Sequence, residues 1–562
     1  MKHNIISIIL SEIRLPLIIL TLVYSISILG LTLIPNNNTT EGLSFFEAFY
    51  VTTYTATTIG FGELPNEFSE PQRFWMLLVI YTSVISWLFT IGKIVQVMKN
   101  PAIAANIKEK KFQQRVNHLT NDFWIVCGYG KAGTGVVEIM RKHGTSTIVI
   151  DPDQNKIHDF FLKEYDSENL FLTGRADEIK TLKLAGIDKP NCKGIIIVTN
   201  DDEINLKISI FSKVIAPSIT TITKTTNQET EDNIRSFKGN YIINSHKIFS
   251  ETLLEMYLSP SKGSVHSWLT SELFGRGEPT KVPKGPWILC GLGDFGISVD
   301  KTLRKITNQI YYIGNIIDEQ ITWDDIDDRF SWASGVEEKH LIEADIQNSR
   351  GIIAGTNSDI DNLSIIMTAK NLNKNIFTIA RINDHENKEL FDKINCDVIY
   401  EPFESLIRHI YQKISVPLVG KFINETKHLD ESWHNEMLAR YYAIANDDED
   451  IETWDYTINA KSAYGPFLHI KMGEKITLEH ICSTFENRGL GFNTIPLMIV
   501  RNNTYIISPE YDLNINAGDT ILFIGISSAR DSMKWTMHNP NVMYYRIYGK
   551  EPAPKILSKI TQ

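Results

Sequence analysis

The sequence predicts two membrane-spanning helices joined by a re-entrant loop, followed by two α/β domains and a small β-rich C-terminal lobe. Three observations support this fold class. Two apolar segments near the N-terminus lack ionisable groups, and a glycine-rich segment lies between them. In the rest of the chain a pattern of strand and glycine motif occurs twice, at an offset of about 160 residues. That offset indicates a duplicated domain, because solenoid repeats are much shorter.

The two apolar segments cover residues 15–34 and 74–91. Each is close to the ~20 residues that a helix needs to cross the hydrocarbon core of a bilayer. A buried helix of a soluble protein would normally show a polar face over that length. A signal peptide is the alternative for the first segment, but Pro35-Asn36-Asn37-Asn38 follows it instead of a small-residue cleavage site. The sequence therefore predicts two spans in a lipid bilayer.

Flanking charges predict the orientation of these spans. The basic residues before the first span and after the second are Lys2, Arg14, Lys93, Lys99, Lys108, Lys110 and Lys111. The loop between the spans is acidic, with Glu41, Glu47, Glu63, Glu67 and Glu70 against Arg73. The positive-inside rule places both termini in the cytoplasm. The expected location is the inner (plasma) membrane of the cell. The acidic loop then faces outside, where it concentrates cations.

Composition limits the classes of partner. A chain of 562 residues is too long for a single core, so several domains are expected. The formal net charge of −11 argues against nucleic acid as a partner. The five cysteines are scattered without the paired spacing of a metal site.

The glycine-rich segment reads Thr57-Thr58-Ile59-Gly60-Phe61-Gly62-Glu63. Residues 44–54 before it predict a short aromatic helix, because Ser44 and Glu47 have the spacing of a capping box. Alternating glycines let a backbone turn its carbonyl oxygens to one side, where they can replace the hydration shell of a monovalent cation. In a soluble protein the same residues would form a glycine turn. The position between two spans favours an ion pathway.

Thr58-Ile59-Gly60-Phe61-Gly62 resembles the potassium-channel signature Thr-Val-Gly-Tyr-Gly, with Glu63 in place of the usual aspartate. Two spans around one such loop resemble the two-transmembrane prokaryotic potassium channels. The resemblance implies that K⁺ permeates and that the channel is a homotetramer, because one chain supplies one quarter of the filter. Phe61 lacks the hydroxyl that tyrosine uses to brace the filter. The implied filter residues are Thr58, Ile59, Gly60, Phe61 and Gly62.

The first α/β domain opens with an apolar strand that runs into a G-x-G-x-x-G motif at residues 123–133. This arrangement is typical of Rossmann-like domains, in which the amides of the following helix bind the phosphates of a dinucleotide. Asp151 ends the second predicted strand, where an acid reads ribose hydroxyls; a helix N-cap before Pro152 is the alternative. The predicted nucleotide-binding residues are Gly128, Tyr129, Gly130, Lys131, Ala132, Gly133, Asp151, Arg175, Ala176 and Thr199.

The second α/β domain repeats the motif with weaker support for a dinucleotide. Asn315 stands where the ribose-binding acid is expected, so the charge is lost. We expect this second site to bind weakly, to bind another ligand or to be structural. Its candidate residues are Gly291, Leu292, Gly293, Asp294, Phe295, Gly296 and Asn315.

Both units resemble RCK domains, the TrkA-N-like regulators of K⁺ conductance that form gating rings below channel pores. Residues 249–258 and 405–414 resemble the crossover helices by which such domains pair. The resemblance implies a ring of eight units in a tetramer, gated by NAD or an adenine nucleotide. The expected domains are a pore domain 1–98, a linker 99–120, a first RCK domain 121–283, a second RCK domain 284–430 and its C-terminal lobe 431–562.

An acidic run in the second domain is a candidate Ca²⁺ site, formed by Asp324, Asp325, Asp327 and Asp328. Closely spaced carboxylates can bind Ca²⁺, and divalent-cation binding is also implied by the family resemblance. No EF-hand spacing is present, so a solvated loop is the alternative.

Two other functions compete with a gated channel. A membrane-anchored NAD-dependent oxidoreductase would use the same glycine loops. The sequence shows no substrate domain with a placed acid/base partner, so we predict that the chain is not an enzyme. A potassium transporter subunit is disfavoured because in that superfamily the regulatory domains are separate polypeptides.

Overall fold

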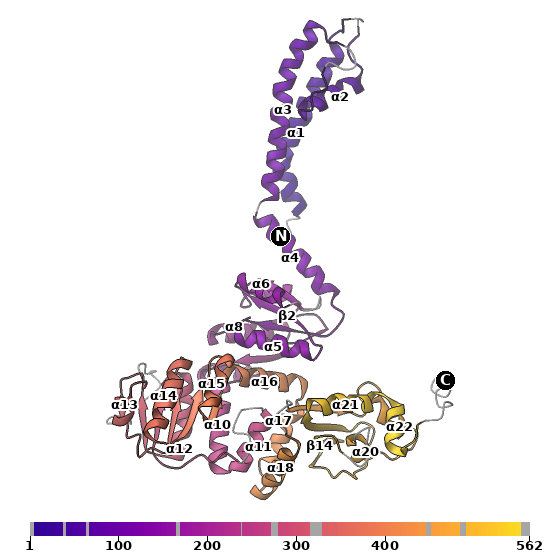
Figure 1. Ribbon diagram of the computed structural model, residues 1–562. Coiled ribbons are helices and arrows are strands. Elements are labelled where there is room, and N and C mark those ends of the chain that lie inside the picture. The colour runs from indigo at the N-terminus through magenta and orange to yellow at the C-terminus, as the bar shows by residue number, and fades with distance from the viewer. Residues whose placement is uncertain are drawn as a thin grey trace. The chain divides into compact units, whose positions relative to one another are not determined.

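The computed structural model describes residues 5–37, 41–62, 67–99, 101–163, 169–237, 239–270, 279–314, 329–445, 451–483 and 491–551. The chain divides into two compact units, Met1–Leu119 and Thr120–Gln562. Figure 1 shows the elements of both units. Eight residues considered above lie outside the described residues: Lys2, Asn38, Glu63, Asn315, Asp324, Asp325, Asp327 and Asp328.

The first unit is helical, with α1 (Ile5–Leu33), α2 (Phe45–Ala56), α3 (Glu70–Met98) and α4 (Pro101–His118). Candidate membrane spans cover Glu12–Leu33 and Glu70–Val97. The helices α1 and α3 pack closely, because Gly30 makes room for Trp75: a Cβ on Gly30 would lie 2.1 Å from the indole ring. Elsewhere the two helices expose large apolar side chains, including Leu15, Leu33, Phe74, Tyr81, Ile85 and Leu88. Apolar surface of this extent requires lipid or another protein to cover it.

The second unit begins with a parallel sheet in the order β3-β2-β1-β4-β5-β6. This is the order of doubly wound dinucleotide-binding folds, which reverse direction between β1 and β4. In register, Val126 of β1 lies between Val149 of β2 and Ile196 of β4. The elements are β1 (Phe123–Cys127), α5 (Lys131–Lys142), β2 (Ser146–Asp151), α6 (Asn155–Leu162), β3 (Leu170–Thr173), α7 (Ile179–Leu184), β4 (Cys192–Ile197), α8 (Asp202–Ile215), β5 (Thr220–Lys224), α9 (Gln228–Ser236) and β6 (Tyr241–Ile243).

A second sheet has the order β12-β11-β10-β7-β8-β9, which is the same winding repeated. Its pairings are parallel, as in the first sheet. The structure therefore contains the duplicated α/β domain that the sequence predicts. The elements are β7 (Trp287–Cys290), α12 (Asp294–Ile306), β8 (Ile310–Ile313), β9 (Phe330–Ser331), α13 (Glu338–Glu343), β10 (Gly351–Ala354), α14 (Asp359–Leu372), β11 (Phe377–Arg381), η2 (His385–Asn387), α15 (Lys388–Lys393) and β12 (Val398–Tyr400).

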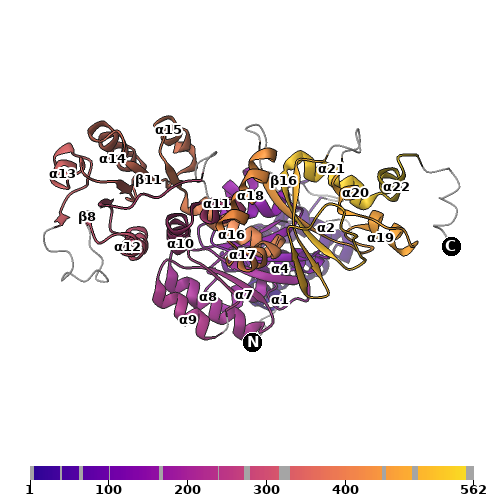
Figure 2. The same ribbon diagram turned by 90° about the horizontal axis from the view of Figure 1, so that it is seen from below.

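The two domains exchange helices. After β6, α10 (Ser245–Leu258) packs on α12 of the second domain, as Figures 1 and 2 show. After β12, α16 (Pro402–Ser415) packs on α5 of the first domain (Figure 1). Phe249, Leu253 and Met256 of α10 belong to the core of the second domain. Leu406, Ile407 and Ile410 of α16 belong to the core of the first. Separating the domains would expose both sets of apolar side chains, so burial holds the pair together.

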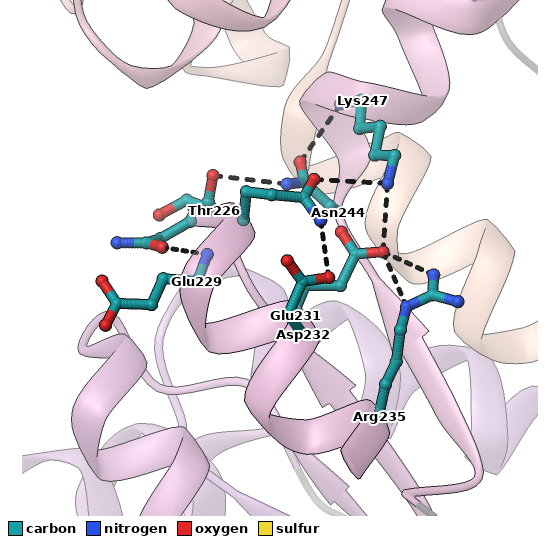
Figure 3. Close-up of polar contacts among 9 residues, drawn as sticks. Thr226, Glu229, Glu231, Asp232, Arg235, Asn244 and Lys247 are labelled. Atoms are coloured by element: carbon teal, nitrogen blue, oxygen red, sulfur yellow. Dashed lines mark hydrogen bonds and ion pairs between the residues drawn. The ribbon is translucent and has the colours of Figure 1, made fainter. Parts of the chain in front are cut away.

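Polar contacts fix the start of α10 (Figure 3). Asn244 caps this helix by accepting a hydrogen bond from the Lys247 amide at 3.1 Å. The carboxylate of Glu231 on α9 is buried and accepts from Lys247 Nζ at 3.1 Å and from Arg235 Nε at 3.2 Å. The exchanged helix is thus tied to the domain it leaves as well as to the domain it enters.

The C-terminal lobe contains an antiparallel sheet in the order β13-β16-β14-β15. It contacts the first α/β domain, because Glu452 of β13 pairs with Lys142 at the end of α5 at 3.2 Å. The helices before it are α11 (Pro260–Thr270), α17 (Leu418–Thr426) and α18 (Glu431–Ile444). The lobe itself comprises β13 (Ile451–Thr457), α19 (Tyr464–Lys471), α20 (Leu478–Cys482), β14 (Thr494–Arg501), β15 (Thr504–Ile507), β16 (Thr520–Ile526), α21 (Ser527–His538) and α22 (Pro540–Tyr548).

Truncating Leu253 is expected to loosen the exchanged pair. The side chain is fully buried on α10, so Leu253→Ala should lower the free energy of unfolding by about 2–5 kcal/mol. Denaturant unfolding of the full-length chain, followed by tryptophan fluorescence, measures this change. Leu258→Ala on the same helix is the control, because Leu258 is 70% exposed. Equal stability of the two variants would contradict the exchange.

Candidate functional site

The loop between α1 and α3 begins with the helix that the sequence predicts. Ser44 caps α2, and both bonds of the capping box are present: the Glu47 amide donates to Ser44 Oγ at 3.3 Å, and the Ser44 amide donates to Glu47 Oε2 at 2.9 Å. Ala48, Val51 and Thr52 of α2 are buried. The chain then leaves α2 at Thr57 and enters the glycine-rich segment.

Every second residue of the glycine-rich segment has a left-handed backbone. The φ angles are 60° at Thr58, 64° at Gly60 and 90° at Gly62. Alternating hand along a backbone lets successive peptide groups face the same way. Ile59 and Phe61, which lie between, are 60% and 56% exposed. The segment can therefore present a row of carbonyl oxygens on one side, as ion coordination requires.

A hydroxyl braces this segment, although Phe61 has none. Tyr54 Oη donates a hydrogen bond to the Gly62 carbonyl oxygen at 2.5 Å. The Tyr54 ring also meets Phe61 edge-on, with centroids 5.7 Å apart, and Tyr50 stacks on Phe61 at 6.4 Å. Tyr54 was not predicted as a functional residue from the sequence. A signal was present, because Tyr50 and Tyr54 are four residues apart in the predicted helix that precedes the glycine-rich segment.

A pocket of about 470 Å³ opens at the carboxyl ends of β1, β2 and β4, where the strand order reverses. Ligands of doubly wound folds bind at such switch points. Six of the ten predicted nucleotide-binding residues line it: Gly128, Gly130, Asp151, Arg175, Ala176 and Thr199. We call it the switch-point pocket.

The glycine loop has the shape that a bound phosphate requires. Gly128 makes the turn with φ of 97°, and a Cβ on Gly133 would lie 1.9 Å from the Gly128 carbonyl oxygen. Gly130 caps α5, and no atom lies within 4 Å of where its Cβ would be. The free amides at the start of α5 thus face open space, where a pyrophosphate is favoured.

Asp151 ties the glycine loop to the end of β2. Its Oδ2 accepts from the Tyr129 amide at 2.7 Å and from Lys156 Nζ at 2.9 Å, and the residue is 3% exposed. Helix α6 begins four residues later with Gln154 as its N-cap, so Asp151 does not cap that helix. The carboxylate is held at the pocket wall, in position to accept from a ribose hydroxyl.

The other predicted residues lie outside the switch-point pocket. Tyr129 and Ala132 are buried in the core, where Tyr129 meets Phe160 edge-on at 5.6 Å. Gly133 allows α5 to approach the Gly128 carbonyl oxygen closely. Lys131 points to the second domain, and its Nζ lies 2.8 Å from Asp384 Oδ2. This Lys131 contact holds the pKa of the Asp384 carboxyl below its usual value.

Arg175 and Asp177, which line the switch-point pocket, belong to a cluster of charged side chains with Lys207. Arg175 Nε donates to Asp177 Oδ1 at 3.0 Å, and Lys207 Nζ donates to Asp177 Oδ2 at 2.8 Å. Hydrogen bonds from Arg175 and Lys207 hold the pKa of Asp177 well below its usual range. Lys156 also lines the pocket and was not predicted from the sequence. Its contact with Asp151, five residues earlier, depends on the short loop between β2 and α6.

The second glycine loop has the same turn but different surroundings. Gly291 has φ of 92°, and the space beside Gly293 is open, as at Gly130. Leu292 and Phe295 are buried, and the Phe295 ring stacks on Tyr400 at 4.9 Å in contact with the exchanged helix α10. A Cβ on Gly314 at the end of β8 would lie 3.2 Å from Leu292 Cγ. The Leu292 side chain therefore lies close to the end of β8. In the first domain the corresponding end of β2 carries Asp151.

Comparison with known families shows what these parts are. Residues 16–100 match the ion-channel domain, and residues 124–245 and 287–402 each match the TrkA-N domain. The chain is an ion-channel domain followed by tandem TrkA-N domains. The ion-channel match covers both candidate spans and the loop between them, which favours a channel over the oxidoreductase considered above.

Two curated relatives of this chain carry the names of potassium channel proteins. Potassium channel protein 1 of Methanocaldococcus jannaschii is 28% identical over 200 residues, which are 35% of this chain and 57% of that protein. Probable potassium channel protein 2 of the same organism is 25% identical over 43% of this chain and 66% of that protein. The matches thus span less than two thirds of these relatives' lengths. Among solved structures, the GsuK channel bound to NAD is 15% identical with a TM-score of 0.46, covering 95% of this chain and 99% of that one.

Proposed function

We propose that four copies of this chain form a potassium-selective channel whose opening is controlled by NAD or an adenine nucleotide bound to the first TrkA-N domain. The observation that carries the proposal is the backbone of residues 58–62. In a loop between two candidate spans, alternate residues take positive φ and a tyrosine hydroxyl braces the last carbonyl. Backbone carbonyls arranged in this way replace the hydration shell of K⁺.

The pathway needs more than one chain. One loop supplies one wall, with open space beside Gly60 and Gly62 and exposed side chains at Ile59 and Phe61. Closed cyclic symmetry completes such a pathway, and four copies give a homotetramer. We place it in the plasma membrane with both termini in the cytoplasm, on the charge asymmetry of the loops.

Exposed apolar residues on the TrkA-N domains suggest where the copies meet. Helix α8 exposes Val214 at 72%, and the equivalent helix α14 of the second domain exposes Ile360 at 80% and Met367 at 55%. Apolar side chains at this exposure favour protein–protein contact. Four chains carry eight TrkA-N domains, and contacts through α8 and α14 would join them into a ring.

The switch-point pocket favours an adenine nucleotide with a free ribose 2′-hydroxyl. The buried Asp151 carboxylate can accept from that hydroxyl, whereas a 2′-phosphate would meet a like charge. NAD, ADP and ATP satisfy this requirement and NADP does not. By linkage, the nucleotide opens the pore only as far as it binds the open ring more tightly than the closed ring.

A role for Ca²⁺ stays a prediction from the sequence. The four aspartates concerned lie outside the described residues. Within the described ranges, no group of three or more His, Cys, Asp or Glu side chains is placed to hold a metal ion.

Reconstitution of the full-length chain into liposomes tests the ion pathway. A K⁺ gradient should drive flux that barium blocks and chloride replacement leaves unchanged. Under bi-ionic conditions the reversal potential should favour K⁺ over Na⁺ strongly. Equal permeability to K⁺ and Na⁺ would contradict the filter assignment.

Removing the Tyr54 hydroxyl is expected to weaken the filter. Tyr54→Phe deletes the bond to the Gly62 carbonyl, a loss of about 0.5–1.5 kcal/mol in each chain. We expect a lower K⁺/Na⁺ permeability ratio and faster decay of current in single-channel recordings. Tyr50→Phe is the matched control, because its contact with Phe61 is made by the ring. The assignment of Tyr54 fails if both variants conduct as the unmodified channel does.

A further inference from the structure

A second pocket adjoins the switch-point pocket and lies between the two TrkA-N domains. It has a volume of about 860 Å³ and is lined from the first domain by Gly130, Lys131 and Lys156 and from the second by Asp384, His385 and Glu401. We call it the interdomain pocket. Gly130 and Lys156 line both pockets, so the two meet at the N-terminus of α5.

The junction of the pockets is where a pyrophosphate would lie. Gly130 caps α5 with open space beside it, and Lys131 is the first residue of that helix. An adenosine in the switch-point pocket, with its ribose at Asp151, directs its phosphates to these amides. A mononucleotide ends there. A dinucleotide extends beyond the pyrophosphate. The interdomain pocket, which shares Gly130 with the switch-point pocket, is the space that its second nucleoside can enter.

The lining of the interdomain pocket is acidic. Its carboxylates outnumber its lysines: they are Glu138, Asp159, Asp384, Glu386, Glu401 and Glu404, against Lys131, Lys156 and Lys163. Carboxylates accept hydrogen bonds from ribose hydroxyls and from a carboxamide, and they attract a cationic ring. A further phosphate, such as the γ-phosphate of ATP, would be repelled.

Two of these carboxylates belong to the second domain and are held in place. Glu401 is 8% exposed, with Oε2 at 2.6 Å from His385 Nδ1 and Oε1 at 3.4 Å from Lys388 Nζ. Asp384 lies beside the phosphate site through its contact with Lys131, whose Nζ also donates to the Asn383 carbonyl at 3.2 Å. Lys131 therefore stands between a bound phosphate and the second domain.

We propose that an adenine dinucleotide with a cationic or neutral second base bridges the two TrkA-N domains. Its adenosine occupies the switch-point pocket, and its second nucleoside occupies the interdomain pocket, where Asp384 and Glu401 of the second domain contact it. This proposal rests on the proposed nucleotide site. It adds that the ligand is a dinucleotide and that the second domain distinguishes a dinucleotide from a mononucleotide. ADP fills only the first pocket and leaves the second domain without a contact to the ligand.

Asp384→Asn in the full-length chain tests this bridge. Titration calorimetry in detergent should show binding of oxidised NAD weakened about tenfold, as expected for loss of one charge-assisted contact, with ADP binding unchanged. The matched control is Asp392→Asn, an exposed aspartate on α15 outside the pocket lining. It should leave both affinities unchanged. Unchanged ADP binding also shows that the Asp384 variant is folded.

Other outcomes separate the bridge from the site itself. If Asp384→Asn leaves NAD binding unchanged, or weakens NAD and ADP equally, the bridge is overturned and the nucleotide site stands. If the unmodified chain binds neither nucleotide, the proposed nucleotide site fails, and the bridge fails with it. Oxidised NAD should also bind more tightly than NADH, because only the oxidised nicotinamide is cationic. Tighter binding of NADH would contradict the role of the acidic lining.

Discussion

Gly130→Val should abolish nucleotide binding while leaving the fold intact. No atom lies within 4 Å of the position of a Cβ at Gly130, and its φ of −90° suits any residue. The added Cβ therefore meets no atom beyond its chain neighbours, and the side chain enters the space through which a phosphate reaches the amides of α5. Losing two such charge-assisted bonds, at about 1.5–3 kcal/mol each, corresponds to a fall in affinity of about a hundredfold or more.

The second glycine loop supplies the control for this variant. Gly293 caps α12 with the same open space, but Leu292 packs close to Gly314, near the position where the ribose acid would be. Calorimetry with ADP should therefore show wild-type affinity for Gly293→Val. Unchanged affinity in Gly130→Val would remove the first glycine loop from the site. Loss of binding in both variants would assign the nucleotide to both domains.

Gly62→Ala should abolish potassium-selective conduction. The φ of 90° at Gly62 lies beyond the left-handed region that an L-residue tolerates. Alanine would have to rotate the backbone, which turns the carbonyl away from Tyr54 Oη and disturbs the alternation that begins at Thr58. The strain is about 1–2 kcal/mol in each chain and occurs in all four subunits.

Gly92→Ala is the matched control for the filter variant. Gly92 lies within α3, and no atom is found within 4 Å of its Cβ position. Alanine is favoured over glycine in a helix by about 1 kcal/mol, so this variant should assemble and conduct. Size-exclusion chromatography checks assembly, and reversal potentials measure selectivity. A Gly62→Ala channel that still selects K⁺ over Na⁺ would contradict the filter assignment.

Short sequence patterns predicted those elements that are stabilised by contacts between residues close together in the chain. The capping box at Ser44 and Glu47 formed as its spacing indicated, because both bonds lie within one turn of helix. The glycine loop likewise has its predicted turn, since Gly133 must approach the Gly128 carbonyl closely. The doubly wound order follows from alternating strands and helices around such a loop.

Contacts that depend on tertiary placement were not predicted. The Tyr54 hydroxyl reaches Gly62 only because the chain folds back on α2 after Thr57. Lys131 reads as a phosphate ligand from its place in the motif, yet the structure directs it to Asp384, more than 200 residues away in the chain. Resemblance suggested crossover helices, but only the structure shows each entering the other domain's core. Such pairings depend on the arrangement of two sheets, which no local pattern contains.

The central claim is that a nucleotide in the first TrkA-N domain controls a potassium-selective pore. The most direct test is a nucleotide titration during single-channel recording of the full-length chain and of Gly130→Val. We predict that NAD or an adenine nucleotide changes the open probability of the unmodified channel, at constant conductance and K⁺ selectivity, and has no effect on the variant. The account would be contradicted if no such nucleotide changed the open probability of the unmodified channel. It would also be contradicted if the open probability of Gly130→Val changed as much as that of the unmodified channel.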